Sequence, residues 1–134
     1  MAFDGISINT LIGTGSFIKG DVRIDGMVRL DGDLEGRLET PERVYVGSES
    51  RVKGDIIAKS VVVCGIIQGD IIAPEGVKIE SSGMVIGDII TTKIVVDNDV
   101  IIHGRCFAID NREIFEQELE KYKSMRAISQ RLYK

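Results

Sequence analysis

The chain has 134 residues, a length that suits one domain and is too short for two of ordinary size. Hydrophobic residues make up 43% of it and charged residues 28%, which excludes a wholly disordered chain and predicts a packed core. There is no Trp, and there are only four Phe and three Tyr, so the core must consist mainly of Ile, Val and Leu. The formal net charge of -4 excludes broad attraction to phosphate, so we expect no nucleic-acid partner.

The first 13 residues are interpreted as a separate N-terminal segment that is partly flexible. The first 20 residues lack both a basic start and a long apolar run, so they do not predict a signal peptide. No purely apolar run exceeds four residues, which excludes a helix that spans a membrane. We therefore expect a cytoplasmic protein.

Glycine divides the remainder of the chain into two parts. All fifteen glycines lie between Gly5 and Gly104, and neither Gly nor Pro occurs from Asp110 to Lys134. We therefore predict a glycine-punctuated body over residues 14–109 and an amphipathic helix over residues 110–134.

The body repeats at intervals of 15 to 18 residues. The repeat is anchored on six glycines: Gly20, Gly36, Gly54, Gly69, Gly87 and Gly104. The residues two places before the anchors are Ile18, Leu34, Val52, Ile67, Val85 and Ile102, and those two places after are Val22, Leu38, Ile56, Ile71, Ile89 and Cys106. A third column is expected eight residues after the first five anchors, at Val28, Val44, Val62, Val77 and Val95.

This register predicts short strands, because apolar residues on both sides of each anchor recur with a period of two. A unit of about 17 residues with three short strands is typical of one turn of a β-solenoid. Equivalent residues then stack on one another at about 4.8 Å per turn. We predict an all-β, three-sided solenoid of about six windings, followed by a C-terminal α-helix.

Part of the body also fits a six-residue phase, which is the mark of the left-handed β-helix of hexapeptide acyltransferases. Such an enzyme needs a His as general base and a projecting substrate loop. The sole histidine, His103, has no Ser, Asp or second His at a telling spacing, and no segment between strands is long enough for that loop. This transferase remains the alternative function, although the repeats by themselves do not fix the handedness.

Other candidates for chemistry have structural interpretations. Cys64 and Cys106 fall in inward columns and are expected in the core, and no second cysteine lies near either one to form a zinc site. The Asp97-Asn98-Asp99 run is interpreted as a turn rather than a calcium site. We therefore expect no catalytic residue, no cofactor and no metal ligand.

The two ends of a solenoid expose unpaired backbone groups and an open apolar core, so each end must be capped or must stack on another end. At the N-terminal end the expected apolar surface consists of Leu11, Ile12, Phe17 and Ile18. The last winding is expected over residues 100–109, with Ile102 in its inward column. Stacked ends can propagate into a filament without any hydrolysis.

The C-terminal helix is predicted to begin at Asp110, with Glu113 as the partner in a capping box. Its apolar stripe consists of Ile114, Phe115, Leu119, Tyr122, Met125, Ile128 and Leu132. Three positions for this helix stay open: it plugs the last winding, it lies along one side of the rod, or it pairs with another protein.

Several segments resemble the bactofilin domain. The opening run Thr10-Leu-Ile-Gly-Thr-Gly-Ser-Phe-Ile-Lys-Gly-Asp-Val-Arg-Ile-Asp-Gly26 and the run Leu30-Asp-Gly-Asp-Leu-Glu-Gly36 look like the start of that domain. The later runs Val52-Lys-Gly-Asp-Ile56, Ile67-Gln-Gly-Asp-Ile71 and Val85-Ile-Gly-Asp-Ile89 are similar to its successive turns. The likeness covers about residues 10 to 109, and the ordered set is specific although each Gly-Asp pair is not.

The resemblance implies a right-handed β-helix and a bacterial cytoskeletal protein that polymerises without nucleotide. It implies contacts of N-terminal winding to N-terminal winding and of C-terminal winding to C-terminal winding, with Phe107 at the position of the apolar end residue. It also implies scaffolding of cell-envelope, peptidoglycan-remodelling or cell-shape machinery at the cytoplasmic face of the inner membrane. Met1, Ala2 and Phe3 match the short apolar segment that contacts the membrane in this family. The helical tail departs from the short, flexible ends that are common there.

Overall fold

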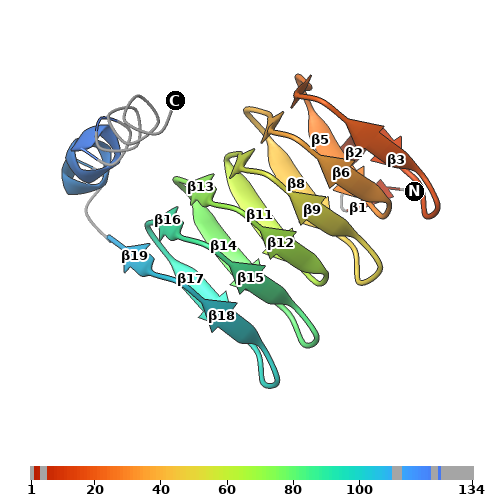
Figure 1. The fold of residues 1–134 in the computed structure, drawn as a ribbon. Helices are drawn as coiled ribbons and strands as arrows, with labels where there is room; N and C mark the ends of the chain where they lie inside the picture. The colour runs from red at the N-terminus through yellow and green to blue at the C-terminus, as the bar shows by residue number, and fades with distance from the viewer. Residues whose placement is uncertain (1, 4–5, 110–112, 122–123, 125–134) are drawn as a thin grey trace, which may run out of the picture.

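The computed structural model describes residues 2–3, 6–109, 113–121 and 124. The chain winds into a three-sided rod of stacked coils, with one sheet on each side (Figure 1). Sheet I contains β1 (Ala2–Phe3), β2 (Ile6–Ile12), β5 (Met27–Leu30), β8 (Arg43–Val46), β11 (Ser60–Val63), β14 (Gly76–Ile79) and β17 (Ile94–Val96).

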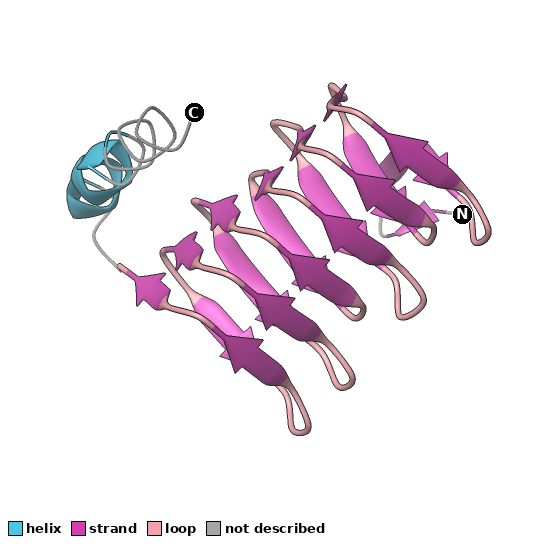
Figure 2. Cartoon of the chain, in the orientation of Figure 1, coloured by secondary structure: helices cyan, strands magenta, loops and turns pink. Residues whose placement is uncertain are grey.

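The other two sheets contain six strands each. Sheet II contains β3 (Phe17–Lys19), β6 (Asp33–Glu35), β9 (Arg51–Lys53), β12 (Ile66–Gln68), β15 (Met84–Ile86) and β18 (Ile101–His103). Sheet III contains β4 (Val22–Arg23), β7 (Leu38–Glu39), β10 (Ile56–Ile57), β13 (Ile71–Ala73), β16 (Ile89–Thr91) and β19 (Cys106–Ala108). Each coil therefore contributes one strand to every sheet, and the described residues form six coils (Figure 2).

The parallel registers confirm two of the predicted columns. In sheet II the pairs run from Ile18 to Leu34, Val52, Ile67, Val85 and Ile102. In sheet III they run from Val22 to Leu38, Ile56, Ile71, Ile89 and Cys106. The anchor glycines and a period of two were therefore sufficient to predict which residues stack on one another in sheets II and III.

The prediction of the third column was wrong at two positions, Val62 and Val95. Sheet I aligns Val28 with Val44, Val61, Val77 and Ile94. Four residues separate Ile56 from Val61, whereas five separate Leu38 from Val44, so the corner between sheets III and I varies in length. The shorter corner moves Val61 inward in place of Val62, because a shift of one residue reverses the face of a strand.

The solenoid also begins earlier than the predicted boundary at residue 14. Strand β2 pairs with β5 through Thr10 to Val28 and Ile12 to Leu30, so the end of the predicted N-terminal segment forms part of the first coil. Strand β1 pairs with β2 in the antiparallel sense, whereas every other strand pair within the described residues is parallel. The core itself is a single apolar column along the rod axis, built from Ile, Val, Leu and a few Ala side chains.

The anchor glycines form a ladder that no other residue fits. At Gly54 φ is +149°, and a Cβ atom there would lie 2.0 Å from the carbonyl oxygen of Gly36. The same clash recurs from coil to coil, whereas a Cβ atom on Gly20 in the first coil would meet nothing within 4 Å. Glycine is therefore required here both for its backbone conformation and for the close approach of successive coils.

We predict that Gly54→Ala lowers the free energy of unfolding by more than about 4 kcal/mol, because strain and a backbone clash act together. Gly20→Ala has the strain of a φ of +129° without the clash and should lower it by about 1–3 kcal/mol. Denaturant unfolding followed by circular dichroism measures both values. Equal losses in the two variants would contradict the close stacking of coils.

The C-terminal helix, described at residues 113–121 and 124, lies along one side of the rod. Phe115 is only 1% exposed and packs with Ile72 and Ile90 on the outer face of sheet III. Leu119 packs against the same cluster, so the alternative in which the helix plugs the last coil is not the one found. The predicted cap at Asp110 and the later stripe residues Tyr122, Met125, Ile128 and Leu132 lie outside the described residues.

Candidate assembly surfaces

The two ends of the rod leave strand edges without a partner strand within the described residues. At the C-terminal end these edges belong to β17, β18 and β19, each the last strand of its sheet. At the N-terminal end the open edges belong to β3 and β4, whereas β1 covers part of the edge of β2. Unpaired edges carry rows of N–H and C=O groups that favour pairing with another chain.

Exposed apolar side chains gather at the N-terminal end. Leu11 is 61% exposed and Phe17 is 62% exposed, and both point away from the core. Ile18 continues the inward column of sheet II but is only partly buried, because no coil lies beneath it. Ile12, the fourth predicted residue, is buried in the core and offers little surface. Leu11 and Phe17 thus lie on the outer faces of sheets I and II in the first coil, and Ile18 lies at the open end of an inward column.

The C-terminal end exposes a second apolar surface on the last coil. Ile101 on β18 and Val95 and Val96 on β17 are all exposed. Ile102 lies in the inward column of sheet II and is only partly buried. Phe107 on β19 is 38% exposed, and its register with Ile90 places it on the outer face of sheet III. Its side chain therefore points sideways from the rod, while the edge of its strand faces the end.

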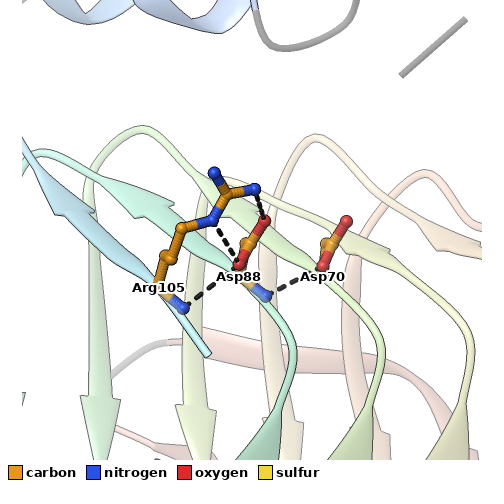
Figure 3. A network of polar contacts seen from close by, with 3 residues as sticks. All are labelled: Asp70, Asp88 and Arg105. Carbon is orange, nitrogen blue, oxygen red and sulfur yellow. Dashed lines mark hydrogen bonds and ion pairs between the residues drawn. The ribbon is translucent and has the colours of Figure 1, made fainter. Parts of the chain in front are cut away.

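A column of aspartates ties successive coils together beside the glycine ladder. Oδ1 of Asp55 accepts a hydrogen bond from the backbone N–H of Asp70 at 3.0 Å, and Oδ1 of Asp70 accepts one from that of Asp88 at 2.9 Å. Figure 3 shows the end of this column, where the N–H of Arg105 donates to Asp88 at 3.1 Å. The column therefore bonds the third, fourth, fifth and sixth coils to one another through a side chain and the backbone.

Arg105 closes this column at the last coil. Its Nη2 lies 2.9 Å from Oδ2 of Asp88, and its guanidinium carbon lies 5.6 Å from the centre of the Phe107 ring (Figure 3 shows the ion pair). The repeated Gly-Asp pairs are visible in the sequence, but neither the hydrogen-bonded column nor the part of Arg105 in it was predicted from them. One residue thus connects the polar column to the apolar surface at the C-terminal end.

The two cysteines lie in different surroundings, and only one of them is buried. Cys64 is buried at a corner outside the main apolar core, with its Sγ 3.5 Å from Oη of Tyr45 and 3.3 Å from Oε2 of Glu80. Cys106 continues an inward column as predicted, yet it is exposed because no coil follows it. The expectation that both thiols are core residues was therefore wrong for Cys106, whereas Cys64 is buried without belonging to the main apolar core.

The thiols lack the features of reactive cysteines. Burial raises the pKa of the Cys64 thiol, and its hydrogen bond to Glu80 adds to that rise. The hydrogen bond with Cys64, together with burial, raises the pKa of Tyr45 to about 12. Burial also raises the pKa of the Cys106 thiol. Both thiols are therefore protonated at neutral pH, and a protonated thiol is a poor nucleophile.

We predict that iodoacetamide modifies Cys106 in dilute folded protein at least about tenfold faster than Cys64, because Cys64 reacts only after local opening. Both rates should rise with pH well above neutrality, because the raised pKa values keep the thiolate fractions low. Peptide mass spectrometry over time measures the two rates. Rapid modification of Cys64 in the folded chain would contradict its burial.

The described residues present no arrangement typical of an enzyme site. His103 ends β18, is exposed, and makes no hydrogen bond through its ring within this part of the chain. No group of three or more His, Cys, Asp or Glu side chains among these residues is placed to hold a metal ion. Nor does any helical stretch described here combine the length and apolar character that crossing a membrane requires. Ala2 and Phe3 form β1, and Met1 lies outside the described residues.

A family model for bactofilin, described as polymer-forming cytoskeletal, matches residues 10–107. The chain belongs to the bactofilin family. Its fold is similar to a cryo-electron microscopy reconstruction of double-helical bactofilin filaments from Thermus thermophilus, with a TM-score of 0.67 and 24% identity. That match covers 74% of this chain and 98% of the other. No curated protein matches the sequence. The family predicted from the Gly-Asp repeats is thereby confirmed.

Proposed function

We propose that this bactofilin is a non-enzymatic cytoskeletal scaffold that self-assembles end to end into filaments without a nucleotide. The observation that carries the proposal is the pair of open rod ends, where strand edges and apolar side chains occur together. The similarity to a filament of another bactofilin supports it. Joining two ends would pair the free backbone groups and bury Leu11, Phe17 and Ile18 at one joint and Ile102 and Phe107 at the other.

The proposed contacts join like ends, N-terminal coil to N-terminal coil and C-terminal coil to C-terminal coil. Such contacts are two-fold, so each residue at the joint meets a surface of the same composition. Two different joints at opposite ends of one rod alternate along a filament and let it grow without limit. The helix supports this arrangement, because it packs on sheet III rather than across the end of the rod.

We predict that Phe107→Arg shortens or abolishes filaments while thermal unfolding stays cooperative. Loss of about 1.5–3 kcal/mol of apolar burial per joint corresponds to roughly 10- to 100-fold weaker association. Negative-stain microscopy and sedimentation of purified protein without nucleotide measure the effect.

The matched control is Ile66→Arg, because Ile66 is also 38% exposed but lies in the middle of the rod. This variant should keep filaments of normal length. Equal filament length in Phe107→Arg and the parent protein would remove Phe107 from the joint. Discrete trimers in the parent protein would contradict a filament and support the hexapeptide acyltransferase instead.

We further propose that the filament acts at the cytoplasmic face of the inner membrane, where it organises cell-envelope or peptidoglycan-remodelling proteins. Met1, Ala2 and Phe3 would provide the membrane contact. Three residues bury little apolar surface in a single copy, but the many copies in a filament bind together with a high effective concentration. The support for this proposal is the family membership and the apolar character of these three residues.

We predict that assembled protein co-sediments with phospholipid vesicles and that Phe3→Asp releases it while filaments remain visible by microscopy. Phe107→Arg should also bind more weakly, because unassembled copies lose the gain from multivalency. Filaments of the parent protein that stay in the supernatant, or Phe3→Asp filaments that still sediment with vesicles, would refute the membrane contact.

A further inference from the structure

The outer face of sheet II changes character halfway along the rod. Its outward side chains form two columns, because side chains alternate between the inside and the outside along each strand. One column consists of Phe17, Asp33, Arg51, Ile66, Met84 and Ile101, and the other of Lys19, Glu35, Lys53, Gln68, Ile86 and His103. Five of the six outward residues on the first three coils are charged, whereas the six on the last three coils have no formal charge at pH 7. These last six residues are called the uncharged patch below.

The uncharged patch is open, whereas the similar apolar stripe on sheet III is covered. Ile66 is 38% exposed and Ile101 is 54% exposed. On sheet III, by contrast, Ile72 and Ile90 are buried because Phe115 of the C-terminal helix packs on them. In Figure 1 the strands of sheet II face the viewer, and the described part of the helix lies away from them, near β16 and β19. The patch therefore has no cover among the residues that the structure describes.

The charges on the same face restrict how a second copy can cover the patch. A two-fold contact would lay the patch on an identical patch, and exposed apolar patches are typical of contact surfaces. If the two rods were parallel and in register, Arg51 would face the partner's Lys53, and Asp33 would face the partner's Glu35, so like charges would repel. If they were antiparallel with complete overlap, Arg51 would lie on the partner's Ile66 and would be buried without a counter-ion.

An antiparallel pair that is offset by three coils avoids both problems. Met84 then lies opposite the partner's Met84, and Ile66 lies opposite the partner's Ile101. Gln68 lies opposite the partner's His103, where an amide and an imidazole can form a hydrogen bond. The charged half of each rod extends beyond the end of the other rod and stays in water. Of the three arrangements, this one covers the patch without burying a charge.

We propose that the uncharged patch is a two-fold contact between two copies of this chain, which lie side by side and antiparallel with their last three coils overlapping. Three coils span about 14 Å along the rod, so the contact is much smaller than a standard interface of about 800 Å² per partner. The pair is therefore weak in dilute protein and forms as the concentration rises. The patch faces sideways, so the inference does not depend on end-to-end assembly.

Disulfide trapping tests this contact in the full-length chain. Met84→Cys is combined with Cys106→Ser, and Cys64 is retained because it is buried. The two-fold axis passes between the two copies of position 84, so mild oxidation should join them into a dimer. The matched control is Arg51→Cys, which lies in the same column but beyond the end of the partner. We expect the Met84→Cys dimer to form at least about tenfold faster, although Arg51 is the more exposed position.

A second pair of variants tests the composition of the patch. Ile66→Arg, added to Met84→Cys, should lower the dimer yield to that of the Arg51→Cys control, because it places a charge in the contact. Glu35→Arg introduces the same side chain at an exposed position of the charged half and should leave the yield unchanged. Ile66→Arg is also expected to leave filament length unchanged, so loss of side contacts and loss of end contacts are separate outcomes.

The expected result is a dimer band on non-reducing electrophoresis with Met84→Cys that increases with protein concentration. Equal rates for Met84→Cys and Arg51→Cys, no dimer with either, or an unchanged yield with Ile66→Arg would each overturn the proposal. The dimer should persist when Phe107→Arg is added. Its loss there would show that the disulfide joined end-to-end neighbours and would also overturn the side contact. Cooperative thermal unfolding of the reduced variants shows that the disulfide forms between folded chains.

Discussion

Each coil of this bactofilin depends on the coil before and after it. A coil of three short strands contains no backbone pairing of its own, and its inward side chains form only a thin layer. Stacking supplies both needs, because parallel pairing satisfies the backbone and brings like side chains into contact along the axis. Close stacking also explains the glycine ladder. Successive coils approach so closely that a Cβ atom at Gly54 would clash with the carbonyl oxygen of Gly36.

The proposed function follows from the first and last coils, because each of them has a neighbouring coil on one side only. The first and last coils have the same inward columns as the middle ones, yet Ile18 and Ile102 remain only partly buried. In this scheme assembly needs no bound nucleotide and no catalytic group. The free energy comes from strand pairing and apolar burial between two ends, which are the same interactions that join successive coils within the chain. The cysteines agree with a structural role, since both thiols have raised pKa values.

The sides of the rod serve a different purpose from its ends. Sheet III has an apolar outer stripe at Ile57, Ile72 and Ile90, which would be a liability in an exposed filament. The helix buries this stripe through Phe115, and the edge of β19 has no partner strand among the residues that the structure describes. Arg105 stands at the boundary between the two regions, because it binds Asp88 within the rod and lies against Phe107 near the end. In the proposed function, assembly along the axis and protection of the side therefore depend on separate residues.

The sequence by itself determined the family, the three-sided solenoid and two of its three inward columns, because glycine anchors and a period of two are local features. It also indicated the apolar ends, which follow from any open stack of coils. Only the tertiary structure decided that Val61 and Ile94 point inward rather than Val62 and Val95, since this depends on the length of a corner. The exposure of Cys106 and the position of the helix on sheet III likewise needed the structure. The physical reason is that the burial of a side chain depends on the coils and helices that lie next to it. The repeat pattern alone does not show where the stack ends or which sheet the helix covers.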